Sequence, residues 1–128
     1  MRNVARIVTA SLALTAVLLA GCEYDVQVDF ELGPGQSTGM RTYRFVIDPT
    51  AGDVEVLVRN GDPLYVVLHV FEVRADLDTG TVDVDYIIFV DEDAITDTTY
   101  ESAMVLTYSL PTIEQRQAKR ADFTVRVE

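Results

Sequence analysis

Hydrophobic and polar residues alternate with a period of two along most of this 128-residue chain. Such alternation is typical of a β-strand with one buried and one solvated face. The alternating stretches end at turn residues such as Gly-Pro-Gly, Asp-Pro and Asn-Gly-Asp-Pro. The pattern predicts seven strands, at residues 24–32, 43–47, 54–58, 64–77, 82–90, 100–110 and 123–127.

Seven short strands separated by regular turns favour an all-β domain, an antiparallel sandwich. An immunoglobulin-like arrangement fits the strand count, but the Cys…Trp…Cys pattern of antibody domains is missing, since the chain has one cysteine and no tryptophan. Between the last two strands, residues 112–121 are rich in helix formers and begin with a capping-box pattern, Thr112 followed by Gln115. We therefore expect one short helix there.

The central hairpin, residues 64–90, can be registered from residue types. Placing Leu77 opposite Val82 puts Phe71 and Ile88 on one face and pairs Arg74 with Asp85 on the other. In this register Asp76 faces Asp83, a repulsive pair. Far from the turn, five apolar residues then fall on the face opposite Phe71 and Ile88: Val66, Leu68, Val70, Ile87 and Phe89.

A strand that is apolar on both faces is covered on both faces. The five residues are therefore covered either by a loop or the short helix of the same chain, or by another molecule. The second interpretation makes them a candidate interface with a partner protein or a second copy of the chain, because large uncovered apolar patches are unusual on monomers.

The first 21 residues have a different pattern. Arg2 and Arg6 precede an uncharged, mostly apolar run of about 14 residues that ends at Ala20. This is the layout of a secretory signal peptide. A retained transmembrane helix is the alternative, but such a helix needs about 20 apolar residues. We expect a helical signal peptide at residues 1–21, cleavage between Gly21 and Cys22, and a mature domain at residues 22–128.

The four residues Leu19-Ala20-Gly21-Cys22 resemble the lipobox of bacterial lipoproteins. The resemblance covers about the first 23 residues and implies that Cys22 receives a diacylglycerol, with further acylation of the new amino terminus. Two or three acyl chains hold a protein firmly to a membrane, whereas one does so only marginally. Residue 23 is glutamate, not the aspartate that commonly retains Gram-negative lipoproteins in the inner membrane, which implies the outer membrane if the organism is Gram-negative. The mature domain itself resembles no family.

The net charge of the chain excludes one class of partner. The chain has 21 acidic and 10 basic residues, and removal of Arg2 and Arg6 with the signal peptide leaves a formal charge of about −13. Such a surface repels the phosphates of nucleic acids, so we expect no nucleic-acid binding. Only Glu23 separates Cys22 from the first predicted strand. At roughly 3.5 Å per residue, the domain is expected within about 10 Å of the lipid headgroups.

Few residues in the sequence are candidates for metal binding or catalysis. Acidic residues near the hairpin turn and beyond the hairpin are weak calcium candidates: Asp76, Asp78, Asp83, Asp91 and Asp93. Calcium needs six to eight oxygen ligands, and neither group matches the twelve-residue EF-hand loop. A solvated acidic rim is the simpler interpretation. His69, the only histidine, stands in a mostly apolar run and is expected at a strand or core rim.

The sequence therefore predicts a lipid-anchored cell-envelope protein without enzymatic activity or a resident cofactor. Its expected role is binding or scaffolding towards another envelope protein, or self-association. Two alternatives remain open: a calcium- or glycan-binding surface module that uses the acidic loops, and a hydrolase that uses a pair of carboxylates. A stoichiometric protein partner would favour the first role, calcium-dependent melting the second, and turnover that depends on one acid the third.

Overall fold

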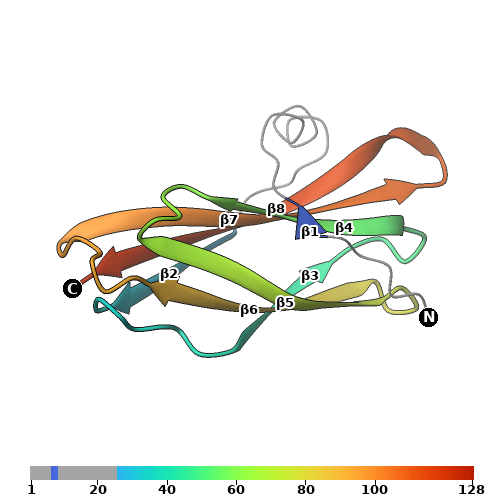
Figure 1. Ribbon diagram of the computed structural model, residues 1–128. Helices are drawn as coiled ribbons and strands as arrows, with labels where there is room; N and C mark the ends of the chain where they lie inside the picture. Colours follow the sequence, from blue (N-terminus) through green and yellow to red (C-terminus); the bar gives the residue numbers. More distant parts are fainter. Residues whose placement is uncertain (1–6, 9–25) are drawn as a thin grey trace.

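The computed structural model describes residues 7–8 and 26–128 and consists of β-strands and turns (Figure 1). The expected all-β fold is confirmed, and all seven expected strands are present. The strands are β1 (Ile7–Val8), β2 (Val26–Leu32), β3 (Arg41–Val46), β4 (Gly52–Asn60), β5 (Val66–Asp76), β6 (Thr81–Val90), β7 (Thr98–Leu110) and β8 (Ile113–Val127). In the part of the chain that the structure describes, no helix is long and apolar enough to cross a membrane.

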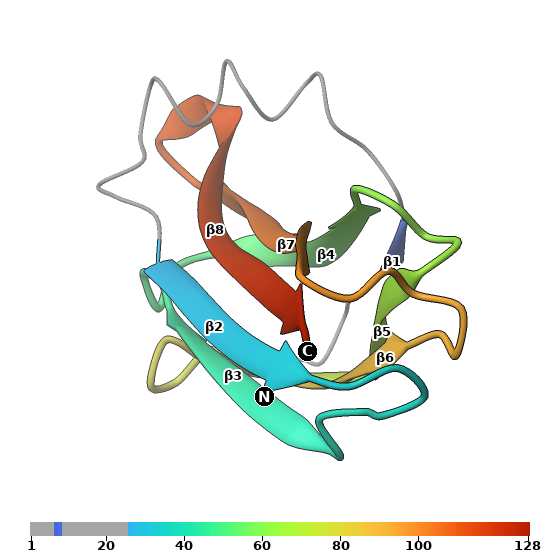
Figure 2. The same cartoon turned by 90° about the vertical axis from the view of Figure 1, so that its left-hand side faces the viewer.

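The strands form two layers, seen end-on in Figure 2. One sheet has five strands in the order β1-β4-β7-β8-β2, and the other has three in the order β3-β6-β5. The expectation of a wholly antiparallel sandwich is wrong at two places, because β2 pairs in parallel with β8 and β1 pairs in parallel with β4. The chain crosses from one sheet to the other between β2 and β3, so β2 has no consecutive strand beside it and joins the free edge of β8.

The helix expected at residues 112–121 does not form. These residues belong to β8, which makes a tight hairpin with β7 that begins at the pair Leu110 and Ile113 and continues to Thr98 and Val127. A helix would leave the matching half of β7 without a backbone partner on that side, and unpaired backbone groups are costly. Pairing along the whole hairpin therefore outweighs the helix propensity of this segment.

The hydrophobic core lies between the two sheets. Phe123 of β8 is fully buried and contacts two aromatic residues of the opposite sheet, with ring centroids 6.2 Å from Tyr43 and 4.9 Å from Tyr86. Both contacts have the tilted or edge-to-face geometry that aromatic pairs prefer. Inward-facing residues of both layers complete the core; the largest fully buried ones besides Phe123 are Leu68, Ile88, Met104 and Leu106.

The hairpin of β5 and β6 has a different register from the expected one. Ala75, not Leu77, lies opposite Val82, and Asp76 lies opposite Thr81, so the register differs by two residues and the turn occupies residues 77–80, one residue earlier than expected. The amide of Gly80 donates to the carbonyl of Asp76 at 2.9 Å and closes this turn. Asp76 therefore does not face Asp83, and the repulsive pair predicted from the sequence is absent.

Gly80 is required by this turn for two reasons. Its φ is +75°, a left-handed conformation that costs an L residue about 1–2 kcal/mol. A Cβ atom at this position would also lie only 2.3 Å from the carbonyl oxygen of Ile47. We expect Gly80→Ala to lower the free energy of unfolding by about 3 kcal/mol, the conformational cost plus the 1–3 kcal/mol of a steric clash.

The matched control is Gly39→Ala. Gly39 has nearly the same φ, +70°, but a Cβ there would have no neighbour within 4 Å. Denaturant titration of both variants should show the larger loss for Gly80→Ala. Equal losses would mean that the contact between the turn and Ile47 contributes nothing.

Candidate interaction surface

The expected interface residues are divided between two faces of the three-stranded sheet. Val66, Leu68 and Val70 point into the core and are only 1%, 2% and 6% exposed. They cannot contribute to a surface, so this part of the sequence prediction is wrong. Ile87 and Phe89 lie on the opposite, outward face, as their positions between the buried residues of β6 indicate.

A β-bulge explains the error. The register of β5 against β6 shifts between Val70 and Glu72, so the extra residue Phe71 interrupts the alternation. Val70 and Val73 are both buried as a result, although they are three residues apart. Continuous alternation from Phe71 would place every residue before the bulge on the wrong face.

The outward face carries a row of apolar and aromatic side chains, which we call the outer patch: Val67, His69, Phe71, Ile87 and Phe89. Val67 lies opposite Phe89 and His69 lies opposite Ile87. Phe71 and Phe89 are 48% and 46% exposed, and the His69 and Phe71 rings meet edge to face with centroids 4.5 Å apart. Sequence reasoning missed Val67 and Phe71 because their outward position depends on the bulge. His69 is exposed on this patch.

One end of the outer patch opens into a hollow of about 420 Å³. Val67 and Phe89 line it from the sheet, and Leu64, which is 78% exposed, lines it from the turn before β5. Asp91 and Glu92, which follow β6, stand at its border.

The other end of the same face carries a charge ladder that links all three strands. Arg44 of β3 donates from Nε to Asp83 Oδ1 at 2.8 Å and from Nη2 to Asp83 Oδ2 at 3.0 Å. Arg74 of β5 makes a bidentate pair with Asp85, with Nη2 3.0 Å from Oδ1. Thr42 also donates to Asp85 at 2.7 Å. The predicted pair of Arg74 and Asp85 is confirmed as an ion pair, although Asp83 is directly opposite Arg74.

These contacts shift the acidity of the groups involved. Hydrogen bonds from Arg44 lower the pKa of Asp83, and hydrogen bonds from Arg74 and Thr42 lower that of Asp85. The pKa of each arginine is raised in turn by its carboxylate partner.

Acid should therefore weaken the folded state through these two carboxylates. A carboxylate with a lowered folded pKa contributes stability above its unfolded pKa, about 3.9 for aspartate, and that contribution is lost as the pH falls through the folded value. We expect the double variant Asp83→Asn/Asp85→Asn to be less stable than the wild type at pH 6, by the small amount usual for exposed pairs. The difference should shrink as the pH falls below the unfolded value of about 3.9, as measured by urea titration at a series of pH values. A difference that is independent of pH would contradict this electrostatic account.

The calcium candidates do not come together. Asp76 and Asp78 lie at the turn before β6, whereas Asp91 and Asp93 follow its far end, about 30 Å away for a ten-residue strand. Asp83 is held by Arg44, Asp76 accepts from the amide of Asp78, and Asp91 accepts from the amide of Asp93. Within residues 7–8 and 26–128, no group of three His, Cys, Asp or Glu side chains could hold a metal ion.

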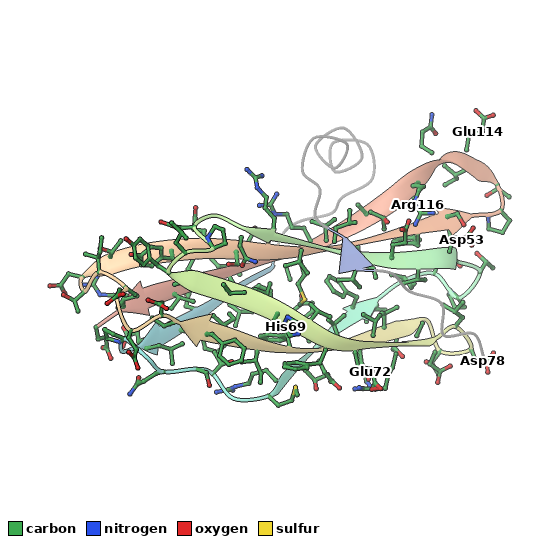
Figure 3. All side chains as sticks on the ribbon, viewed as in Figure 1. Asp53, His69, Glu72, Asp78, Glu114 and Arg116 are labelled. Carbon is green, nitrogen blue, oxygen red and sulfur yellow. The ribbon has the colours of Figure 1, made fainter. Side chains whose placement is uncertain are left out.

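The outer face of the five-stranded sheet carries mixed charges instead. Arg116 of β8 donates to the carbonyl of Asp53 at 2.5 Å and to Thr107 at 3.0 Å, and Figure 3 shows Arg116 beside Asp53. Asp53 has a φ of +50° at a bulge of β4, so this contact secures an unusual backbone conformation. A hollow of about 280 Å³ on this sheet contains the ion pair of Arg120 and Asp122. These contacts serve the fold.

Gly21 and Cys22 lie outside the described residues, so the predicted cleavage and lipidation remain predictions. Two residues of the predicted signal peptide are described. Ile7 and Val8 form β1 beside Val56 and Leu57, so at these two residues the expected helix is replaced by a strand.

Comparisons with known proteins concern the fold alone. The chain matches no known protein family and no curated protein. Among solved structures it resembles part of a family 123 glycoside hydrolase from Clostridium perfringens, with a TM-score of 0.50 and 7% identity over 80% of this chain and 23% of the enzyme. It thus spans about a quarter of that enzyme.

Two further solved structures are more distant, although the chain spans nearly all of each. The CooA pilin subunit of enterotoxigenic Escherichia coli has a TM-score of 0.40 and 15% identity, over 82% of this chain and 92% of that one. PbICP-C, solved in complex with falcipain-2, has a TM-score of 0.34 and 11% identity, over 82% and 90%.

Proposed function

We propose that this chain is a cell-envelope lipoprotein, anchored through Cys22, that binds another envelope protein through the outer patch. The observation that carries the proposal is the exposure of Phe71 and Phe89 side by side with Val67, His69 and Ile87 on one sheet face. Aromatic side chains that are half exposed in the free protein are typical anchors of protein interfaces. The core is complete without them, since the inward residues of the same strands are buried.

The anchor rests on the sequence pattern of residues 1–22. The anchor would hold the domain near the membrane, because β2 begins at Val26, only four residues after Cys22. At most about 14 Å of extended chain separates the lipidated residue from the sheet. The domain that carries the outer patch is therefore held at the membrane, where a partner in the same membrane is concentrated.

We infer that the two carboxylates of the charge ladder beside the outer patch do not act as general acids. A carboxyl group that acts as a general acid near neutral pH needs a raised pKa. The pKa values of Asp83 and Asp85 are instead lowered by their arginine partners. Their roles are then structural, as links between the three strands.

The anchor is tested by the intact mass of the protein extracted from membranes. We expect the mass of residues 22–128 plus two or three acyl chains, and release from the membrane for Cys22→Ala. A matched control, Ser37→Ala, changes an exposed residue of similar size before β3 and should keep the lipid. A mass of the full 128 residues without lipid would overturn the anchor.

Partner binding is tested by capture from detergent-solubilised envelope with the tagged wild type and two variants. Phe71→Ser/Phe89→Ser removes both exposed rings of the outer patch, and Ile113→Ser removes a side chain of similar exposure, 41%, on β8. We expect one stoichiometric protein with the wild type and Ile113→Ser, and its loss with the double variant. Equal capture by all three would overturn the outer patch as the docking site.

A further inference from the structure

The hollow at the end of the outer patch is large enough to receive a side chain of a partner. Its walls are Leu64, Tyr65, Val67 and Phe89, and it is open to solvent on one side. A volume of about 420 Å³ exceeds that of a large apolar side chain. Two of its apolar walls, Leu64 and Phe89, are 78% and 46% exposed, so a partner side chain placed there would bury them.

The loops that form the hollow are held by backbone hydrogen bonds. The amides of Tyr65 and Val66 donate to the carbonyl of Asp62 at 3.1 and 3.0 Å, and the amide of Asp91 donates to the carbonyl of Tyr65 at 2.8 Å. The amide of Gly35 donates to the carbonyl of Val90 at 3.0 Å on the other side. A hollow that is formed in advance avoids the ordering cost of binding.

The border of the hollow is acidic. Asp91 and Glu92 line it, the neighbouring Asp93 is exposed, and none of the described residues that line it is basic. The carboxylates of the charge ladder are neutralised by arginines, but no ion pair in the described part of the chain involves Asp91 or Glu92. The hollow therefore combines apolar walls with negative charges at its border. Such a site favours a ligand that has an apolar centre and positive charges around it.

We propose that the hollow receives a protein segment whose apolar or aromatic anchor is flanked by arginine or lysine. The inference rests on the proposed function and specifies the chemistry of the partner. The anchor covers Leu64 and Phe89, and the flanking cations pair with Asp91 and Glu92. The overall charge of about −13 of the mature chain assists the approach of such a cationic segment.

The test uses the mature lipidated protein in nanodiscs of phosphatidylcholine, which carry no net charge. Three fluorescent hexapeptides serve as probes: Gly-Arg-Leu-Phe-Arg-Gly, its acidic counterpart with glutamate in place of arginine, and a counterpart with glycine in place of the Leu-Phe pair. Binding is measured by anisotropy at low and high salt. We expect saturable binding of the first peptide only, weakened by salt.

Matched variants locate the binding. Phe89→Ser should weaken it about tenfold, and Glu92→Gln should weaken it several-fold and reduce its salt dependence. Two controls should leave the affinity unchanged. Ile113→Ser removes an exposed apolar side chain of β8, in the other sheet, and Glu72→Gln lies outside the hollow, with Glu72 turned away from the five-stranded sheet in Figure 3. Circular dichroism of each variant confirms that it is folded.

Three outcomes would overturn the proposal: no saturable binding of the basic peptide, equal binding of the acidic peptide, or equal losses from Ile113→Ser and Phe89→Ser. These outcomes differ from a failure of the proposed function. If the envelope partner is still captured through the outer patch while the basic peptide does not bind, the proposed function is retained. Only the proposal of an apolar anchor flanked by arginine or lysine is then rejected.

Discussion

Replacement of Ile88 by glutamate should prevent folding, whereas the same replacement of its neighbour Phe89 should leave a folded protein. Ile88 is 0% exposed in the core, and Phe89 is 46% exposed on the outer patch. A charge placed in the core without a partner costs on the order of 5 kcal/mol or more, comparable with the whole stability of many domains. On the outer patch the carboxylate remains in water, and the expected change is below about 0.5 kcal/mol.

Circular dichroism and size-exclusion chromatography of the two variants provide the measurement. Each variant is a matched control for the other, because both introduce a glutamate at neighbouring positions of the same strand. An unfolded Phe89→Glu variant would mean that the same chain covers this side chain, and the outer patch would no longer be an interface. A folded Ile88→Glu variant would contradict the assigned faces of β6.

Replacement of Phe123 by alanine has the second-largest expected effect. Its fully buried ring joins the two sheets through Tyr43 and Tyr86, so truncation removes contacts from both layers. Truncation of a buried phenylalanine costs about 3–5 kcal/mol. For a domain of this size that loss lowers the melting temperature by on the order of 15 °C or more.

Phe71→Ala is the control, because Phe71 is 48% exposed and contacts the exposed His69. We expect a loss below about 1 kcal/mol for this variant. The measurement is the melting temperature of both variants relative to the wild type. Similar losses would show that the core is not centred on Phe123.

Most of the strands were predictable because inside-outside alternation marks much of their length. In β7, for example, Met104 and Leu106 face the core, and most strands end near a glycine, proline or aspartate. Alternation of apolar and polar residues indicates which side of a strand is buried, so seven strands and the sandwich could be expected from the sequence alone. The partners of the strands were not predictable in the same way, since the parallel pairing of β2 with β8 involves residues about 95 positions apart.

Two errors arose where tertiary pairing overrides local preference. Residues 112–121 contain good helix formers, but the hairpin with β7 binds their backbone along its whole length. At the β5–β6 turn, the positive φ of Gly80 and its hydrogen bond to Asp76 fix the turn at residues 77–80. A glycine at this position could have indicated the earlier turn, because glycine commonly occupies the left-handed position of such turns.

The candidate surface was partly predictable. Phe89 and Ile87 were recognised as outward-facing, but Val66, Leu68 and Val70 were not recognised as core residues. The bulge at Phe71 reverses the faces, and a sequence that is apolar at nearly every position from 64 to 71 contains no alternation that reveals it. The hollow depends on three loops far apart in the sequence, and only the structure brings them together.

The central claim is that the outer patch contacts a partner in the envelope of living cells. Site-specific photo-cross-linking in living cells tests it most directly, with a photoreactive amino acid placed at Phe89, at Phe71 or at Ile113 of the expressed chain. We predict that the first two positions cross-link to the same single envelope protein and that Ile113, on the other sheet, does not. Equal cross-linking from all three positions, or from Ile113 alone, would contradict the account.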